Sequence, residues 1–447
     1  MTASPISPVK NPLPKASLAE TAQVLRDVQG PMVAKGPIIR RPKVVAASER
    51  FDLDGRGVRR AQVLSDKYGR GPLMLNIPGR KMALILDPDD VHRVLDDSPE
   101  PFATAETLKR HALKHFEPKV ALISHGEERT QRRRLNEHTL DHGHPIHQMA
   151  ATFMPAVQQE AEALLEEART AGGVLEYKPF LDAWFRIVRR VVLGDSARED
   201  TDLTQLTEKL RGDGNWAFLK PVDKTGRAAL LAQMQAALDR AEPGSLAAFM
   251  TQQPQGSAAE PAQQIPQWLF AFDPAGMATF RALALLSAHP ATLDAVKRQI
   301  REEQQETAPL LPLLRSTVLE SLRLWPTTPM ILRETTTEVE FAHGVMPAGT
   351  SVLVFAPFFH RDDRQLDFAH RFAPELWERP RTREDWPLVP FSAGPGLCPG
   401  RHLVLLLTSK FMAEILSRAD LELESHTLDP DNLPSLLNNF GLRFTVS

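Results

Sequence analysis

The chain has one cysteine, Cys398, in 447 residues, so no disulfide can form within it and a reducing compartment suits the sequence. No uninterrupted apolar stretch approaches the ~18 residues that span a bilayer, and residues 1–15 lack the apolar core of a signal peptide. The net charge of −3 leaves no basic excess for binding nucleic acid. These absences predict a soluble, cytoplasmic protein without a membrane span or a nucleic-acid partner.

Hydrophobic residues make up 42% of the sequence, which is enough for a large core. Apolar residues at helical spacing predict long helices over 149–168, 180–193, 227–240 and 267–288. Alternating apolar residues predict a β-hairpin over 73–77 and 82–86, and short strands at 339–341 and 351–355. Prolines are frequent in residues 1–45, which predicts an irregular arm. The expected fold is mainly α with a small β portion, in a single domain over 46–447.

Glycine and proline surround Cys398, because the run from Phe391 to Gly400 reads Phe-Ser-Ala-Gly-Pro-Gly-Leu-Cys-Pro-Gly. These residues predict a tight turn with little bulk around the sulfur. The helix that follows offers free N–H groups and a positive dipole end, which favour a thiolate. A buried structural cysteine is the plainer interpretation. The spacing Phe-x-x-Gly-x-x-x-Cys-x-Gly, however, resembles the haem-thiolate loop of cytochromes P450. The resemblance implies that Cys398 is the iron ligand and that Phe391, Gly394 and Gly400 shape the cofactor site.

A carboxylate and a guanidinium, Glu320 and Arg323, lie one helical turn apart in an apolar segment that ends at Trp325 and Pro326. Exposed pairs of this kind contribute only about 0–1 kcal/mol, and taken alone this pair would be a surface feature. Together with Arg333 downstream, it resembles the Glu-x-x-Arg helix of the same family. The resemblance implies a structural role for Glu320 and Arg323, and contact between Arg333 and a haem propionate.

The basic run over 125–135 has two interpretations. It is either an exposed face that binds a partner or, by resemblance, the start of the family helix that binds the haem propionates. In the second interpretation Arg133 and Arg129 take the two propionate-binding positions, since a guanidinium is a planar, bidentate donor to carboxylates. Arg132 and Arg134 lie elsewhere on the helix, where they can meet an acidic redox partner.

The segment from Phe272 to Thr279 lies in the longest apolar helix and resembles the oxygen-binding stretch of the family. The resemblance implies catalytic roles for Gly276, which leaves room for a diatomic ligand, and Thr279, which relays protons. A packing kink in a core helix is the alternative for Thr279. Ala278 replaces the family's acidic residue, so the relay uses water, Asp273 or the substrate, or is absent. Asp273, which stands nearly alone, is also the expected partner for a substrate amine.

Two further positions depart from the family pattern. Gly396 stands where the family often has an arginine or histidine that donates to a propionate, and Arg401 is a partial substitute. Leu376 stands where an arginine would complete the group around the Glu-x-x-Arg pair, and Arg379 and Arg381 are the candidates to replace it.

The resemblance implies a monooxygenase that carries haem b (iron protoporphyrin IX) and inserts one oxygen atom from O2 into a lipophilic small molecule. No flavin or nicotinamide motif follows a strand, so electrons are expected from a separate ferredoxin-type partner and its reductase. The expected substrate pocket is mostly apolar and includes Ile123, Phe272, Ala275, Met330 and Leu437. Three alternatives remain: a peroxide-driven peroxygenase, a nitric oxide reductase on the same fold, and a non-catalytic haem protein that binds a gas.

Overall fold

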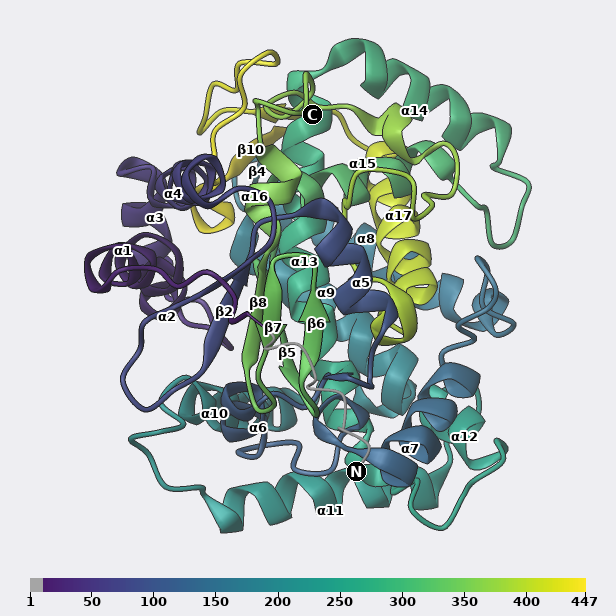
Figure 1. Cartoon of the computed structure of the whole chain (residues 1–447). Helices are drawn as coiled ribbons and strands as arrows, with labels where there is room; N and C mark the ends of the chain where they lie inside the picture. The colour runs from purple at the N-terminus through teal and green to yellow at the C-terminus, as the bar shows by residue number, and fades with distance from the viewer. Residues whose placement is uncertain (1–10) are drawn as a thin grey trace, which may run out of the picture.

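Long helices pack around one hydrophobic core in the computed structural model, which describes residues 11–447 (Figure 1). All four predicted long helices contribute to this core with boundaries close to those expected: α8 (Ala150–Thr170), α9 (Tyr177–Leu193), α11 (Lys224–Arg240) and α13 (Ile265–Ala288). Helix α15 (Pro312–Leu324) and helix α17 (Arg401–Leu416) complete the core beside α13.

The main sheet has the strand order β1-β2-β8-β5-β3. The predicted hairpin is confirmed, because β1 (Pro72–Met74) pairs antiparallel with β2 (Met82–Ile85). Strand β2 then pairs in parallel with β8 (Ser351–Phe355), which pairs antiparallel with β5 (Met330–Thr335). The short strand β3 (Phe102–Ala103) completes the edge. The sheet therefore joins the N-terminal quarter of the chain to the segment that precedes Cys398.

The remaining elements surround the helical core and the main sheet. The helices are α3 (Pro42–Arg50), α4 (Leu53–Tyr68), α5 (Pro88–Asp96), α6 (Thr107–Leu113), α7 (Gly126–Thr139), α10 (Thr201–Gly214), α12 (Leu246–Thr251), α14 (Pro290–Glu302) and α16 (Ala356–Arg361). The small sheets consist of β4 (Val174–Glu176), β9 (Leu421–Leu423) and β10 (Arg443–Val446), and of β6 (Val339–Phe341) and β7 (Gly344–Met346). The mainly α fold with a small β portion is as predicted.

The prediction of an irregular arm over residues 1–45 is wrong for much of the part that the structure describes. Residues 18–35 form α1 (Leu18–Val24), a short π-helical stretch and α2 (Gly30–Lys35). Ser17 and Glu20 cap α1 reciprocally. The prolines are compatible with helices here, because Pro31 stands in the first turn of α2 and Pro42 in the first turn of α3, where no backbone N–H is needed. Residues 1–10 lie outside the described part.

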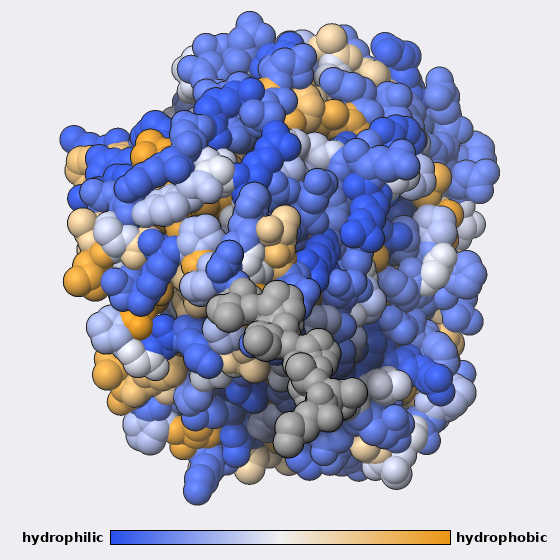
Figure 2. Space-filling model, viewed as in Figure 1, coloured by the Kyte–Doolittle hydropathy of each residue, from blue (hydrophilic) through white to orange (hydrophobic). Residues whose placement is uncertain are grey.

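Within residues 11–447, one segment, Pro261–Ala288, is long and apolar enough to cross a membrane. Asp273 and Arg281 interrupt this segment, so it is not an uninterrupted apolar stretch. Most of its apolar part (83%) is buried among other elements, as in a core helix such as α13. Hydrophilic residues dominate the molecular face in Figure 2, and apolar residues form only scattered patches on it.

Candidate functional site

Backbone hydrogen bonds close the Cys398 loop on itself, and Gly394 lies against the end of α5. The Cys398 N–H donates to the Phe391 carbonyl (3.0 Å), and the Leu397 N–H donates to the Gly394 carbonyl (2.9 Å). Gly394 has a φ of +59°, and a Cβ there would lie 2.3 Å from the Leu95 carbonyl oxygen. Only glycine permits this approach, so the predicted tight turn is present and its reason is contact with the end of α5.

The Cys398 thiol sits at the entrance to α17. Burial raises the pKa of this thiol above its ordinary value, and a hydrogen bond from the Gly400 backbone and the charges of Arg133 and Arg401 offset only part of the rise. Gly400 is the residue that precedes α17. The donor and the two cations favour the thiolate, which is the form that binds a metal.

The Glu320–Arg323 pair lies in the interior, with both side chains 0% exposed. Two parallel hydrogen bonds of 2.7 Å join the guanidinium to the carboxylate. Arg323 also donates to the carbonyls of His360, Ala369 and Arg371. The pair therefore fastens α15 to the loop after α16, which supports the predicted structural role.

The place of the expected third arginine is taken by an indole. Trp377 Nε1 donates to Glu320 Oε1 (2.8 Å), and the Ala373 N–H donates to Glu320 Oε2 (2.8 Å). Arg379 instead pairs with Asp385, and Arg381 donates to the Trp386 carbonyl (3.0 Å). Neither arginine completes the group, which corrects that expectation.

His360 connects this group to the cysteine loop. Its Nδ1 lies 3.2 Å from the Arg323 carbonyl, and its Nε2 accepts from the Val389 N–H (2.9 Å). Burial and the Arg323 charge lower the pKa of His360 to about 3, so the ring is neutral and Nδ1 is the donor. The contacts that begin at Glu320 therefore reach Val389. This residue lies two positions before Phe391, whose carbonyl accepts from the Cys398 N–H.

Three cations converge beside the cysteine loop. Arg333 donates to the hydroxyls of Ser98 (3.0 Å) and Ser392 (3.2 Å), and Arg129 donates to the Pro395 carbonyl (3.1 Å). Burial and the nearby Arg129 charge lower the pKa of Arg333 to about 10. Lys109 donates to the carbonyls of Thr104 (2.7 Å) and Leu332 (3.2 Å). In the described part of the chain, none of the three cations has a carboxylate at ion-pair distance, which suits a ligand with two carboxylates.

The sequence interpretation missed Lys109, because nothing near it in the sequence marks it. Its pKa is lowered to about 7, first by burial and then by the Arg333 charge. The structure also explains why residue 396 is a glycine and not the arginine or histidine of the family pattern. A Cβ at Gly396 would lie 2.5 Å from Arg333 Nη2. Arg333 fills the space that a side chain at 396 would need. Arg401 donates through Nε to His402 Nε2 (3.2 Å).

The arginines of the basic run on α7 lie in different environments. Arg129 is buried beside Arg333, whereas Arg133 pairs with Glu137 (2.6 Å). Arg132 was expected on the surface and is buried instead, because it pairs with Glu128 (2.9 Å) and donates to Ser124 (2.7 Å). Arg134 is exposed as expected.

The Thr279 hydroxyl faces its own helix. It donates to the Ala275 carbonyl (2.7 Å), four residues earlier, and is fully buried. The Ala278 carbonyl accepts from the Ser321 hydroxyl (2.8 Å). Asp273 does not stand alone, since Arg211 pairs with it at 2.5 Å, which corrects its role as a free partner for an amine.

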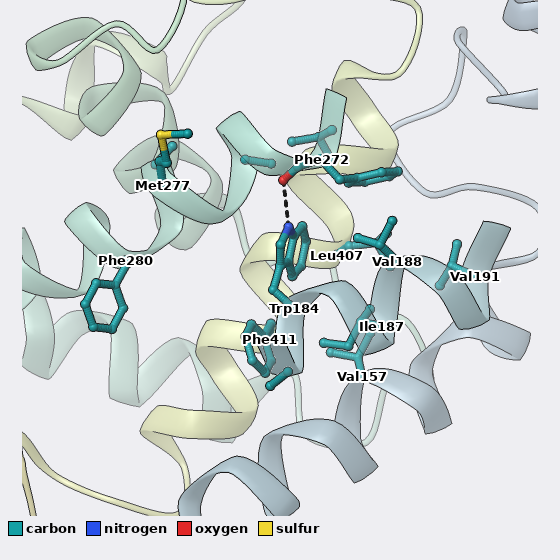
Figure 3. Packing of buried hydrophobic residues seen from close by; sticks show 14 of the residues in the cluster. Val157, Trp184, Ile187, Val188, Val191, Phe272, Met277, Phe280, Leu407 and Phe411 are labelled. Carbon is teal, nitrogen blue, oxygen red and sulfur yellow. Dashed lines mark hydrogen bonds between the residues drawn. The ribbon is translucent and has the colours of Figure 1, made fainter. Parts of the chain in front are cut away.

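Gly276 faces helix α9. A Cβ at Gly276 would approach Trp184 Cδ1 to 2.8 Å, and the Trp184 Nε1–H donates to the Phe272 carbonyl (2.7 Å) (Figure 3). The glycine thus lets the indole lie against α13, so packing against α9 is the reason for its small size. The Phe272 ring also packs against Trp184, with centroids 5.9 Å apart.

Substituting Gly276 by alanine is expected to lower the free energy of unfolding by about 1–3 kcal/mol, because the added methyl overlaps the indole. Urea denaturation measures this change. The matched control is Gly212→Ala, since nothing lies within 4 Å of a Cβ at that helical glycine. Trp184→Phe added to Gly276→Ala should recover part of the loss; additive losses would contradict the proposed overlap.

The other expected pocket residues are apolar and largely buried. Ala275 and Leu437 are buried, and Ile123 and Met330 are partly buried against the two core clusters. These residues lie on separate elements, namely the 3-10 turn Ala121–Ile123, α13, the start of β5 and the segment after α17.

The C-terminal part of the chain is similar to known proteins. A family model for Cytochrome P450 matches residues 250–443. A cyclooctat-9-en-7-ol 5-monooxygenase from Streptomyces melanosporofaciens is 36% identical over 142 residues, covering 30% of this chain and 31% of that protein. A methyltetrahydroprotoberberine 14-monooxygenase from Papaver somniferum is 29% identical over 174 residues, covering 36% of this chain and 32% of that protein. The matched segments thus span about a third of the length of these relatives.

The likeness in structure is more extensive than the likeness in sequence. A zebra fish cytochrome P450 solved with abiraterone superposes with a TM-score of 0.67, covering 87% of this chain and 97% of that chain at 19% identity. The chain thus has the fold of this cytochrome P450, and its residues 250–443 match the family model. A single cysteine at the head of a core helix is the arrangement expected of a haem-thiolate protein of this family. Haem iron is the cofactor of this family, and the cations Arg129, Arg333 and Lys109 fit its two propionates.

Lys109 is expected to add to the pH dependence of haem affinity a contribution that falls above pH 7 by up to about tenfold per pH unit. Loss of the Cys398 proton on ligation acts in the opposite direction, and it is the same in the wild type and in Lys109 variants. The pKa of Lys109 is about 7 in the haem-free structure, and a carboxylate beside it raises this pKa. Lys109 therefore takes up a proton on binding above pH 7. Absorbance titration of haem into the haem-free protein at several pH values measures the slope. Lys109→Met should remove the Lys109 contribution, whereas the exposed Lys119→Met control should not; an unchanged slope in Lys109→Met contradicts the assignment.

Proposed function

We propose that the chain is a haem-thiolate monooxygenase that inserts one oxygen atom from O2 into a lipophilic small molecule. The observation that carries this proposal is the Cys398 loop, where one thiol stands at the head of α17. The loop lies beside Arg129, Arg333 and Lys109, which have no carboxylate at ion-pair distance within residues 11–447. A thiolate-bound haem supplies oxygen activation through O–O cleavage. Haem b suits a chain whose only cysteine serves as the iron ligand, because no second cysteine is left to bond the macrocycle edge.

The chain's own residues have three tasks in this function. Cys398 provides the ligand, and the Glu320–Arg323 group holds its loop in place. Arg129, Arg333 and Lys109 bind the propionates, which fixes the orientation of the macrocycle. Ala275, Met330 and Leu437 supply apolar surface that favours a lipophilic substrate and excludes water.

A peroxygenase is the second candidate, and the proton-relay position favours it. Ala278 carries no acid, and the Thr279 hydroxyl donates to Ala275 within its helix. Asp273, the nearest carboxylate on α13, is neutralised by Arg211. Both oxygen atoms of hydrogen peroxide are already reduced and protonated. A reaction driven by peroxide therefore needs fewer protons from a relay in the protein.

For the monooxygenase, we propose a cytoplasmic ferredoxin-type protein and its reductase as the electron source. An acidic ferredoxin fits the surface around exposed Arg134 on α7 and Arg401 at the start of α17, the two elements that adjoin Cys398. This docking face is smaller than the sequence predicted, because Arg132 is buried.

The test supplies a panel of lipophilic compounds to the haem-loaded protein under two conditions. One uses a surrogate ferredoxin, its reductase and NADPH, and the other uses hydrogen peroxide alone. Product that depends on the electron chain supports the monooxygenase, and product mainly with peroxide supports the peroxygenase. Bound haem without product in either condition overturns both and favours the nitric oxide reductase or gas-binding alternatives.

A further inference from the structure

A small cavity of about 30 Å³ lies where the N-terminal helices meet α13. Asp54 on α4, Arg40 after α2 and Arg281 on α13 line it. The 3-10 turn Asn439–Gly441 contributes Asn439. This volume holds one or two water molecules or a single monatomic ion, and it is too small for an organic ligand.

Positive charge is in excess around this cavity. Lys35 and Asp54 form an ion pair (2.6 Å) in which both side chains are largely buried, so together they add no net charge. In the described part of the chain, Arg40 and Arg281 are the other charged residues that line the cavity, and Arg281 is 4% exposed. Burial, together with the nearby Arg40 charge, lowers the pKa of Arg281 to about 10, so this guanidinium is charged at neutral pH.

The hydrogen-bond acceptors of the two guanidinium groups are all neutral. They are the carbonyls of Gly36, Thr327, Trp325 and Leu437, and the Met32 thioether. Among residues 11–447, no carboxylate lies within ion-pair distance of either guanidinium. Arg40 Nε and Arg281 Nη2 also have no acceptor among these residues, so N–H groups remain for a ligand. Uncompensated buried cations are costly, and they therefore favour an anion.

A polar side chain without a partner lines the same cavity. Asn439 is 1% exposed, and neither its amide nitrogen nor its amide oxygen has a hydrogen-bond partner. Buried amides are nearly always hydrogen-bonded in folded proteins. Because neither end of the amide is engaged, its nitrogen is free to face a ligand. The amide thus points to a bound group independently of the two cations.

We propose that this cavity binds one chloride ion, held by N–H groups of Arg40 and Arg281 and by the Asn439 amide nitrogen. A chloride ion needs little more room than a water molecule, whereas sulfate, phosphate and carboxylates are larger. The bound ion would connect the segment after α2, helix α13 and the turn at Asn439. The site does not depend on the proposed function, because chloride takes no part in that reaction.

The first test is diffraction from crystals of the haem-loaded protein grown in sodium bromide. Bromide occupies chloride sites and scatters anomalously, so a peak in anomalous difference density is expected in this cavity. The second test is the ³⁵Cl NMR linewidth of chloride with the ferrous carbonyl protein, in which the iron offers chloride no free position. The protein should broaden the line, and bromide should reverse the broadening where gluconate at equal ionic strength does not. A cavity that holds only water, with no anomalous peak, overturns the proposal.

Two variants remove the site in different ways. Arg281→Gln should weaken chloride binding by at least about tenfold, because it removes a charged donor. Asn439→Asp should weaken it at least as much, because the new carboxylate takes the place of the anion. This second variant keeps both cations and the side-chain volume, so it tests the site even if Arg281→Gln does not fold.

The matched control is Arg315→Gln. Arg315 is also buried and donates to two backbone carbonyls, those of Leu310 and Pro145, but it does not line the cavity. Chloride binding should be unchanged in this variant. An equal loss of binding in the control and in Arg281→Gln, or undiminished binding in Asn439→Asp, would place the ion elsewhere and refute the assignment.

Discussion

Cys398→Ser is expected to abolish thiolate ligation and to reduce product formation by at least about 100-fold, roughly 2.7 kcal/mol in activation free energy. The serine hydroxyl is nearly isosteric with the thiol but stays protonated, so it cannot supply a thiolate's electron density to iron. The ferrous carbonyl absorption spectrum and the rate of product formation measure the two effects. The Cys398 N–H bond to Phe391 is a backbone contact, so the loop should survive the substitution.

The control for this prediction is Leu397→Ala in the same loop. It alters the chain beside the sulfur and leaves the ligand in place, so the thiolate spectrum should persist. A serine variant that retained both the thiolate spectrum and the activity would show that Cys398 is the buried structural cysteine of the plainer interpretation.

Arg323→Ala is expected to lower the free energy of unfolding by about 3–5 kcal/mol, because Glu320 would remain charged and buried without its partner. The exposure of both side chains is 0%, so solvent cannot compensate. Three backbone carbonyls would also lose their donor. Urea denaturation of the haem-loaded protein measures the loss, and absorbance gives the fraction that still holds haem.

The Arg379–Asp385 pair provides the comparison. Arg379 is 63% exposed, so Arg379→Ala should cost at most about 1 kcal/mol. Similar losses in the two variants would mean that the Glu320–Arg323 pair contributes no more than a surface pair, against the structural role assigned to it.

The sequence predicts best those features that depend on neighbours in the chain. Periodicity and turn residues place α8, α9, α13 and the β1–β2 hairpin within a few residues, because local pattern decides them. The cysteine loop and the Glu320–Arg323 spacing are likewise local motifs. The exception is the N-terminal arm, where prolines in first helical turns resemble loop prolines.

Contacts between distant segments could not be predicted in this way. Lys109 meets Arg333 across more than two hundred residues, and Trp377 takes the place of the expected arginine because the fold brings its indole to Glu320. Asp273 and Gly276 were interpreted from their own helix, whereas Arg211 and Trp184 decide their environments. Partners on other elements set these roles, and a single sequence does not show them.

The parallel pairing of β2 with β8 has a consequence for the synthesis of the protein. The β2 register runs from Met82 to Leu84, and its partner from Ser351 to Leu353. About 270 residues must therefore be translated before this edge of β2 can pair, which takes roughly 15 to 50 s at typical elongation rates. During that interval this edge of the apolar strand β2 is unpaired, and its backbone can pair with other chains. Expression at low temperature or with a holdase chaperone should therefore raise the soluble yield of this protein more than it does for helical proteins with only local contacts.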